Sequence, residues 1–440
     1  MKKYFFGFLT IFIFALSYSQ NYYLASPEGF GAGTTGGGNA TPVLVSNYTD
    51  LKSNLTSVGS KVILVSGIIT IPANQAISAI ITNKSLIGLP GATLVNENQT
   101  TGAGILYLKT GSNNIIIRNL IFVGPGAYDI DGKDDLTADG ATNLWVDHCE
   151  FQDGQDGNFD IKGLSDNVTV SYCKFTYLKP PVSGGSGGSN DHRFSNLVGS
   201  SATDAPTDGH YSITFQNNFW GEGVKSRMPR ARNAELHILS CLFNSSVSGA
   251  TAIGLGGGIN NTTCYVENSN FKKVQTVYSP APADGGAVAL NYVNSLGNGS
   301  NLGTVTAPSY NTTPIPVNKV ELALTDPTCG AGATLQVSGT GVISPSNCTN
   351  LSVINQSLPS ESKVQCTPVM DKKLKINLPK KKSGITEFKI FSPTGQLLVK
   401  QNDITNSVSK IIDLSQLNAG FYLLSAKVGN ENFSCKFYSN

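Results

Sequence analysis

Short runs of β-branched and aromatic residues recur along most of the chain, and each run ends in turn residues. The runs cover residues 61–67, 85–88, 114–122, 143–151, 167–175, 212–220, 236–243 and 265–271. Apolar residues bounded by turn residues are typical of strands, and no helical period separates one run from the next. Residues 47–58 are the exception, because their pattern predicts a short capped helix.

Alignment of the runs gives two columns, one that holds mostly small or polar residues and one that holds aromatic residues. The first column holds Leu120, Cys149, Cys173, Asn218, Cys241 and Ser269, and the second holds Phe122, Phe151, Phe175, Trp220, Phe243 and Phe271. Repeats that cannot bury their own apolar face must stack on one another. The pattern therefore predicts an all-β parallel β-helix with the column cysteines inside. A β-sandwich is the alternative, although the hairpin turns it needs are scarce.

The two ends of the chain differ from this repeat. Residues 1–20 predict a signal peptide, with Lys2 and Lys3 ahead of an apolar stretch that is short for a membrane span. The repeat fades beyond Gly286, and residues 332–365 predict a linker rich in Ser, Thr, Asn and Pro. Five alternating runs between residues 366 and 440 predict a small β-sandwich. The β-helix itself is expected over residues 21–331.

Composition narrows the class of protein. The net charge is +2 and charged residues make up only 14% of the chain, so charge gives no basis for binding nucleic acid or a membrane. The abundance of Gly, Ser, Asn and Thr is typical of secreted β-rich proteins. Export permits disulfides, and Cys329 and Cys348 are predicted to close a short loop.

Two kinds of charged cluster are candidates for chemistry. Arg227, Arg230 and Arg232 fall within six residues around Pro229. Guanidinium groups bind carboxylates in bidentate fashion, so the cluster indicates an acidic ligand, with solvated surface arginines as the alternative. Acidic residues gather at 129–135 and 153–160. Carboxylates without cysteine or histidine partners suit a hard cation such as calcium, with solvated acidic turns as the alternative.

Five motifs in order carry a resemblance to a known family. They are Glu28-Gly29-Phe30-Gly31 with Thr35-Gly36-Gly37, Trp145-Val146-Asp147-His148, Asp156-x-x-x-Asp160-Ile161-Lys162-Gly163, Val168-Thr169-Val170-Ser171-Tyr172 and Arg227-x-Pro229-x-x-Arg232. With these motifs, residues 27–329 resemble the extracellular pectate lyases of polysaccharide lyase family one. The resemblance implies a right-handed parallel β-helix, which agrees with the repeat.

The resemblance also implies roles for single residues. Arg227 would be the catalytic base and Arg232 a contact to a substrate carboxylate. Calcium ligands would fall at Asp134, Asp156 and Asp160. Asp156 stands where relatives often have the longer Glu, and Gly132 stands where some have a further acidic ligand. Both departures are expected to weaken calcium binding or to leave more coordination to substrate and water.

One implied role has two candidate residues, and a further pair of residues is expected to have a structural role. The resemblance implies a substrate-binding lysine after the coil of Asp160. Lys179 lies at nearly the right spacing, and the insertion at residues 180–191 makes Arg193 a rival candidate. Asp147 and His148 resemble catalytic groups in isolation, yet we expect them to make buried hydrogen bonds between coils.

The resemblance implies a secreted, calcium-dependent and monomeric pectate lyase. It would cleave polygalacturonate by β-elimination and leave 4,5-unsaturated oligogalacturonides. Removing the proton alpha to a carboxylate is difficult, and calcium together with Arg232 would stabilise the resulting charge. Arginine holds its proton at neutral pH, so we expect activity to rise towards alkaline pH. The alternatives are a glycoside hydrolase using two carboxylates, a pectin lyase, or a non-catalytic carbohydrate-binding β-helix.

The C-terminal segment resembles a second family. Residues 389–396, 414–423 and 435–437 are similar to the sorting domain of the type IX secretion system of Bacteroidetes. This resemblance implies the type IX machinery as a partner and an extracellular or cell-surface location. A sugar-binding sandwich is the alternative.

Overall fold

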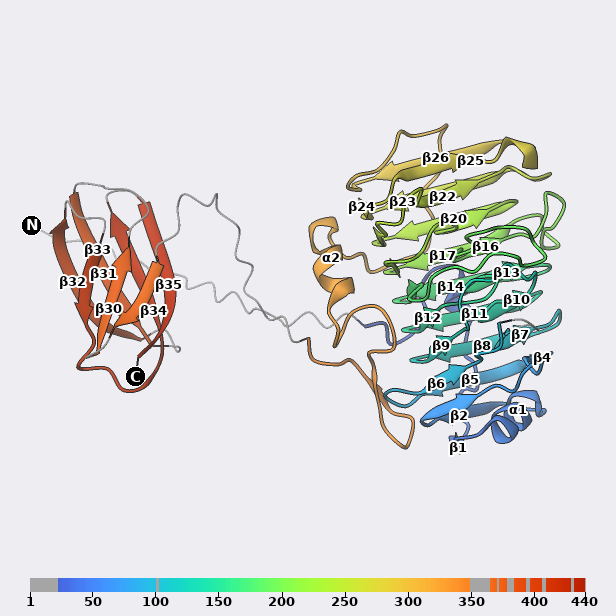
Figure 1. Cartoon of the computed structure of the whole chain (residues 1–440), viewed down its shortest axis with the longest axis horizontal. Coiled ribbons are helices and arrows are strands. Elements are labelled where there is room, and N and C mark those ends of the chain that lie inside the picture. The colour runs from blue at the N-terminus through green and yellow to red at the C-terminus, as the bar shows by residue number, and fades with distance from the viewer. Residues whose placement is uncertain are drawn as a thin grey trace, which may run out of the picture. The chain divides into compact units, whose positions relative to one another are not determined.

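The computed structural model describes residues 23–99, 103–348, 365–369, 372–377, 384–392, 396–405, 409–428 and 431–439. The predicted signal peptide and residues 349–364 of the predicted linker lie outside the described residues. The chain divides into two compact units, Met1–Asn350 and Leu351–Asn440, which are coloured blue to orange and red in Figure 1. Each unit is described by itself.

The first unit is a parallel β-helix of three sheets, as the repeat predicted (Figure 1). The ten-stranded sheet contains β1 (Val43–Val45), β2 (Lys61–Val65), β5 (Thr82–Gly88), β8 (Asn113–Arg118), β11 (Thr142–Asp147), β14 (Asp166–Ser171), β17 (Tyr211–Gln216), β20 (Ala234–Leu239), β23 (Thr262–Glu267) and β26 (Val288–Val293). We call it sheet A. Each of its strands pairs in parallel with the strand of the next coil.

Two eight-stranded parallel sheets complete the coils. Sheet B contains β3 (Ile68–Thr70), β6 (Thr93–Val95), β9 (Ile121–Val123), β12 (Glu150–Gln152), β15 (Lys174–Thr176), β18 (Phe219–Trp220), β21 (Leu242–Asn244) and β24 (Asn270–Lys273). Sheet C contains β4 (Ile77–Ala79), β7 (Leu106–Leu108), β10 (Leu136–Asp139), β13 (Phe159–Lys162), β16 (Leu197–Val198), β19 (Arg230–Ala231), β22 (Thr251–Leu255) and β25 (Thr276–Pro280). The chain runs through A, B and C in each coil.

The aromatic column forms a stack along the interior of sheet B. Phe151 pairs in register with Phe122 and Phe175, and its ring centroid lies 4.8 Å and 5.3 Å from theirs. Trp220 and Phe243 continue the stack with centroids 4.8 Å apart. Aromatic pairs at such separations stabilise a core beyond the area that they bury. The stack is therefore one reason why the coils keep a common register.

The small-residue column lies at the bend between sheets A and B. Leu120, Cys149, Cys173, Asn218, Cys241 and Ser269 are fully buried there. Each follows a residue in the left-handed region, with φ between 46° and 58°: Asn119, His148, Tyr172, Asn217, Ser240 and Asn268. Polar members suit the column because they bond neighbouring coils. Asn218 Oδ1, for example, accepts from Cys173 N at 2.8 Å.

The remaining elements close the β-helix and cover one face of it. They are the 3-10 helices η1 (Gly29–Gly33) and η2 (Pro282–Asp284), the α-helices α1 (Tyr48–Thr56) and α2 (Val317–Thr325), and the antiparallel pair β27 (Gln336–Val337) and β28 (Ile343–Ser344). The predicted capped helix is confirmed, since Asn47 accepts from Asp50 N at 3.0 Å. Cys329 and Cys348 form the predicted disulfide.

Two elements differ from the sequence expectation. β26 continues sheet A beyond Gly286, where the repeat fades, and only two of its residues, Leu290 and Tyr292, are buried. A last strand has no coil beyond it to pack against, so it needs fewer apolar residues. The helix α2 was not predicted. It packs Val320 and Leu324 into an apolar cluster with Trp145 on the outer face of sheet A.

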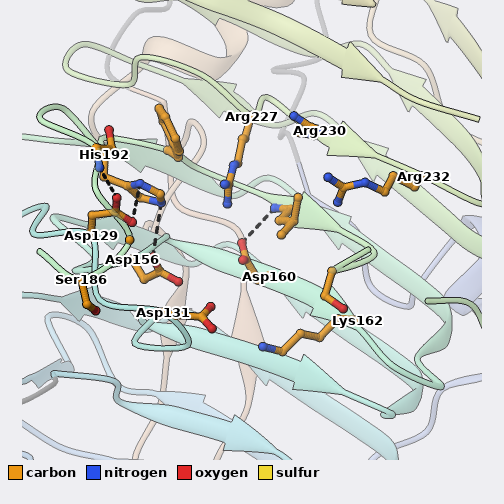
Figure 2. A pocket seen from close by; sticks show the side chains of 15 residues that line it. Asp129, Asp131, Asp156, Asp160, Lys162, Ser186, His192, Arg227, Arg230 and Arg232 are labelled. Atoms are coloured by element: carbon orange, nitrogen blue, oxygen red, sulfur yellow. Dashed lines mark hydrogen bonds and ion pairs between the residues drawn. The ribbon is translucent and has the colours of Figure 1, made fainter. Parts of the chain in front are cut away.

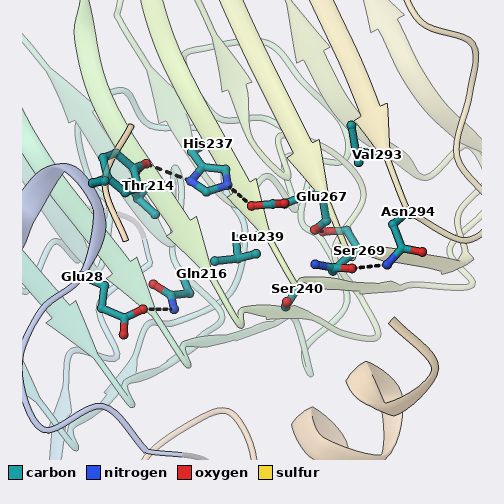
Figure 3. Close-up of polar contacts among 12 residues, drawn as sticks. Glu28, Thr214, Gln216, His237, Leu239, Ser240, Glu267, Ser269, Val293 and Asn294 are labelled. Carbon is teal, nitrogen blue, oxygen red and sulfur yellow. Dashed lines mark hydrogen bonds and ion pairs between the residues drawn. The ribbon is translucent and has the colours of Figure 1, made fainter. Parts of the chain in front are cut away.

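Polar side chains hold the N-terminal segment against the outer face of sheet A (Figure 3). Gln216 Nε2 donates to Glu28 Oε2 at 2.7 Å, and Thr313 N donates to the same oxygen at 2.8 Å. His237 lies 3.0 Å from Glu267 on the neighbouring strand. The Glu28 motif thus joins the N-terminal segment, sheet A and the segment around residue 313.

The second unit consists of two antiparallel sheets. One contains β29 (Gln365–Val369), β30 (Lys373–Asn377) and β33 (Ser409–Asp413); the other contains β32 (Leu397–Thr405), β31 (Gly384–Phe391), β34 (Gly420–Val428) and β35 (Glu431–Ser439). Residues of both sheets, such as Ile376, Phe388 and Leu424, share one buried core. The predicted C-terminal β-sandwich is therefore confirmed.

Candidate functional site

A polar cavity of about 620 Å³ opens beside sheet C, where loops of successive coils lead from sheet B into sheet C. Its lining residues are Asp129, Asp131, Asp156, Asp160, Lys162, Ser186, Gly187, Ser189, His192, Phe194, Leu197, Ser200, Arg227, Arg230 and Arg232 (Figure 2). Stacked coils place equivalent loops side by side. Acidic and basic groups that are far apart in sequence therefore share one cleft.

Asp134 and Asp160 converge on the small residue Gly157. A Cβ atom built on Gly157 would lie 2.9 Å from Asp134 Oδ1 and 3.1 Å from Asp160 Oδ1. Asp134 Oδ1 is buried without a hydrogen-bond partner in the described part of the chain. Its Oδ2 accepts from Thr137 at 2.6 Å, and Asp160 Oδ1 accepts from Leu197 N at 2.8 Å. One oxygen of each carboxylate thus approaches the same point, with Asp160 in the lining of the cleft and Asp134 behind it, outside that lining.

Burial makes these carboxylates costly to ionise without a counter-charge. Desolvation, with the neighbouring Asp160, raises the pKa of Asp134 to about 7. Desolvation, with Asp134, raises the pKa of Asp156 to about 7. Asp160 also has its pKa raised to about 7 by burial, against the opposing effect of Arg227. A cation would relieve this repulsion, so the cluster is suited to bind one.

His192 lies between two other carboxyl groups, as Figure 2 shows. Its Nδ1 is 2.9 Å from Asp129 Oδ1, and its Nε2 is 3.3 Å from Asp156 Oδ1. Burial and the charge of Arg227 lower the pKa of His192 to about 4. Asp156 is therefore shared between the acidic cluster and the imidazole.

Arg227 faces the acidic wall from the loop between β18 and β19 (Figure 2). Its guanidinium carbon lies 4.8 Å from the centre of the Phe194 ring. Its backbone is in the left-handed region with φ of 60°, and the peptide bond between the following two residues, Met228 and Pro229, is cis. A non-glycine residue at positive φ costs about 1–3 kcal/mol, and such residues cluster at functional sites. Asn196 N donates to Arg227 O at 2.7 Å and holds this conformation.

The other two arginines of the motif share one partner. Arg230 and Arg232 lie 2.8 Å and 3.0 Å from Asp284 Oδ2. Arg232 also donates to Gly199 O at 2.6 Å. Both side chains line the cleft and point to its same end, as alternation along an extended segment predicts (Figure 2).

Neither Lys179 nor Arg193, the two candidates for the substrate-binding lysine that the resemblance implies, lines the cleft. Lys179 donates to Gly124 O at 2.8 Å, and Arg193 forms a bidentate pair with Asp191 at 2.7 Å and 2.8 Å. Lys162, on β13, lines the cleft instead. Its signal was present in the sequence, because Lys162 follows Asp160 by two residues and therefore lies on the same face of a strand.

Several lining residues were not named as site residues by the sequence analysis, among them Asp129, His192 and Phe194. Asp129 was noted only as part of an acidic run. His192 and Phe194 follow the insertion at residues 180–191, whose Gly187 N donates to Asp129 O at 2.9 Å. The length of the insertion was a signal, because long loops on stacked coils lie on one face.

Asp147 and His148 form part of a buried network on sheet A. Asp147 accepts from Ser171 at 2.6 Å and pairs with Arg118 at 2.8 Å. His148 Nδ1 lies 2.8 Å from Asp147, and both side chains are fully buried. Neither residue lines the cleft. These contacts agree with the expectation of buried bonding between coils.

Comparisons with known proteins agree with the two-part organisation. A family model described as pectate lyase matches residues 3–331, and one described as secretion system C-terminal sorting domain matches residues 367–439. Pectate lyase B of Colletotrichum gloeosporioides is 32% identical over 314 residues, which are 68% of this chain and 84% of the relative. A pectate trisaccharide-lyase of a Thermotoga species is 31% identical over 236 residues, or 52% of this chain. That match spans 56% of the relative, little more than half its length.

Solved structures share the fold. A pectate lyase variant from Bacillus subtilis aligns with a TM-score of 0.54 at 20% identity, covering 72% of this chain and 98% of that one. A structure titled pectate lyase bound to hexasaccharide aligns with the same TM-score, identity and coverage. The sorting domain marks a secreted or cell-surface protein, and among the described residues no helix is long and apolar enough to cross a membrane. The chain therefore belongs to the pectate lyase family and carries a secretion sorting domain at its C-terminus.

Proposed function

We propose that this chain is a calcium-dependent pectate lyase that cleaves polygalacturonate by β-elimination and releases 4,5-unsaturated oligogalacturonides. Family membership supports a polysaccharide lyase. The observation that carries the proposal is the cleft itself, in which Arg227 faces a buried cluster of carboxylates. An anionic polysaccharide needs both positive side chains and a cation to lie in such a cleft.

The acidic cluster fits calcium by its donor set. Asp134, Asp156 and Asp160 would hold the ion, since all three offer oxygen and calcium accepts irregular oxygen sites. The buried Asp134 Oδ1 has no hydrogen-bond partner among the described residues, so this oxygen is available to coordinate a cation. When bound, calcium would offset the charge of a substrate carboxylate and stabilise the enolate-like transition state.

The protein's own side chains would remove the proton and bind the substrate carboxylates. Arg227 removes the proton alpha to the carboxylate of the sugar on the C4 side of the cleavage. The electron pair of that C–H bond forms the C4–C5 double bond while the bond from C4 to the glycosidic oxygen breaks, and the leaving oxygen takes a proton from water. Arg232 pairs with a substrate carboxylate in the ground and transition states. Lys162, which lines the cleft, would bind a further carboxylate in place of Lys179 or Arg193, the two cations implied by the resemblance.

A glycoside hydrolase is the second candidate, because the raised pKa values of Asp156 and Asp160 are those of a general acid at neutral pH. Pectin lyase activity on methyl esters would not require the acidic cluster. A carbohydrate-binding module without catalysis would not require Arg227 to occupy a strained backbone conformation.

The test follows the products formed from polygalacturonate. Elimination gives unsaturated ends that absorb in the ultraviolet and lack the water that hydrolysis adds, so absorbance and product mass together identify the reaction. Saturated products would establish hydrolysis, and bound but uncleaved polysaccharide would establish a binding module. Preference for methylated pectin would establish a pectin lyase. The polysaccharide and the type IX secretion machinery are the proposed partners, and the enzyme is proposed to act as a monomer.

A further inference from the structure

The cleft contains a histidine that the lyase reaction does not use. His192 is 7% exposed, and its two ring nitrogens lie 2.9 Å from Asp129 Oδ1 and 3.3 Å from Asp156 Oδ1. Neither contact has hydrogen-bond geometry, and both nitrogens are buried without a hydrogen-bond partner in the described residues. Figure 2 shows the imidazole between the two carboxyl groups.

This arrangement is unfavourable for a neutral imidazole without a cation. Neutral imidazole has one N–H and one lone pair, so it can donate to only one of the two carboxylates. At the other nitrogen, which carries no proton, an electron-rich ring atom lies close to a carboxylate oxygen. A cation held between those atoms turns the repulsion into coordination.

The carboxylates are oriented as metal ligands usually are. Asp129 Oδ2 accepts from Ser189 N, and Asp156 Oδ2 accepts from Gly132 N at 2.8 Å. One oxygen of each carboxylate is thus held by a backbone amide, and the other oxygen, Oδ1, faces His192. Hydrogen bonds of this kind orient the ligands of metal sites.

We propose that Asp129, Asp156 and His192 bind a divalent transition metal ion of the zinc class, at a site separate from the calcium site at Asp134 and Asp160. One donor atom from each of the three residues lies within 4.8 Å of the others. Imidazole suits zinc and its neighbours, whereas calcium takes oxygen ligands, so the nitrogen separates the two sites chemically. Asp156 would contribute to both.

The three residues lie in loops of different coils, so a bound ion would link those loops. Asp129, Asp156 and His192 come from the sheet B to sheet C loops of three successive coils, and His192 follows the insertion at residues 180–191. The ion would therefore tie the insertion to the two coils beside it. Because all three residues line the cleft, the coordination positions that the protein leaves open would face bound substrate or water.

The test measures zinc binding, independently of activity. The full chain is stripped with chelator, saturated with calcium and titrated with Zn²⁺ in a calorimeter. Wild type should bind one zinc ion per chain, and His192→Gln should weaken that binding by at least about tenfold. His210→Gln is the matched control, because His210 is a half-buried imidazole outside the cleft, with Nε2 2.6 Å from Asn260 O. It should bind zinc like wild type.

Several results would overturn the proposal. Equal zinc binding by wild type and His192→Gln would place the ion elsewhere. Displacement of zinc by excess calcium would mean a single site that takes either ion. No zinc uptake by wild type would mean that His192 is a protonated bridge between two carboxylates. Circular dichroism checks that each variant is folded, and Asp129→Asn, expected to weaken zinc binding in the same way, replaces His192→Gln if that variant does not fold.

Discussion

The guanidinium group of Arg227 lies over the aromatic ring of Phe194, with 4.8 Å between its central carbon and the ring centre. Phe194 belongs to the loop that precedes β16, and Arg227 to the corresponding loop of the next coil. The flat ring holds the flat guanidinium by cation–π attraction without using its N–H groups. Those groups remain directed at the acidic wall, where substrate is proposed to bind.

Loss of the proposed base should lower turnover far more than binding. Arg227→Ala is expected to reduce kcat about 10²–10⁴-fold, as removal of a general base does. Arg227→Lys should fail nearly as badly, because it keeps the charge but changes reach and geometry. Arg232→Ala should damage both KM and kcat, since its charge acts in ground and transition states. The measurement is ultraviolet absorbance of unsaturated product beside a binding assay.

Controls for this prediction come from the same motif. Arg230→Ala removes a neighbouring arginine that is paired to Asp284, and it should reduce turnover much less than Arg227→Ala. Phe194→Leu removes only the ring face and should cost about 0.5–2 kcal/mol, or roughly 2- to 30-fold in kcat. Arg227→Ala with most of its turnover intact would show that the base is another residue, with Lys179 or Arg193 next to be tested.

Calcium should be required, and Gly157 should control its binding. Chelation is expected to abolish turnover and added calcium to restore it, while Asp160→Ala should remove the response. Gly157→Ala would place a methyl group 2.9 Å from Asp134 Oδ1 and 3.1 Å from Asp160 Oδ1, which should weaken calcium by about 1–3 kcal/mol. Gly33→Ala is the matched control, because no atom lies within 4 Å of its Cβ position. Full activity in excess chelator would refute this prediction.

Stability of the calcium-free chain should fall as pH rises. The pKa values of Asp134, Asp156 and Asp160 are raised to about 7 in the folded chain, from 3.8. A raised pKa stabilises the folded state below the unfolded value, and this contribution is lost as pH rises through about 7. Unfolding by urea in chelator should therefore show decreasing stability between about pH 4 and pH 7.

Calcium should reverse that trend, because it binds the deprotonated carboxylates and its affinity rises over the same pH range. Asp156→Asn removes one of the three titrating groups, so the decline should be shallower in that variant. Stability in chelator that increases between pH 4 and pH 7 would contradict the prediction.

The substrate-binding cation can be identified by three substitutions. Lys162→Ala should reduce kcat/KM by roughly 10- to 100-fold, since loss of a hydrogen bond to a charged group costs about 1.5–3 kcal/mol. Lys179→Ala and Arg193→Ala should have smaller effects, because their side chains are bonded to Gly124 O and to Asp191. A raised KM in Lys179→Ala alone would instead support Lys179, one of the two candidates for the lysine that the family resemblance implies.

The C-terminal sandwich should be dispensable for catalysis. It has its own core, and the boundary between the two units falls after Asn350. A chain that ends at Ser362 should keep its specific activity on polygalacturonate and its unfolding midpoint, while its export through the secretion machinery should be lost. Failure of the shortened chain to fold would show that the sandwich belongs to the catalytic unit.

The sequence by itself determined the coil repeat, the interior columns and the arginine motif. Strand side chains alternate with a fixed period, and each coil must bury the same face, so Phe151 and Phe175 could be placed in one stack from their spacing alone. The disulfide between Cys329 and Cys348 and the helix cap at Asn47 could also be predicted from the sequence, since both depend on residues close in sequence.

Only the tertiary structure decided how the loops of different coils meet. Asp129 and His192 are separated by many residues, and the conformation of the insertion at 180–191, not a repeat, brings them to 2.9 Å. The same holds for Lys179, whose side chain donates to Gly124 O and lies outside the lining of the cleft. Irregular loops have no period by which their side chains can be placed, so their contacts follow from packing between coils.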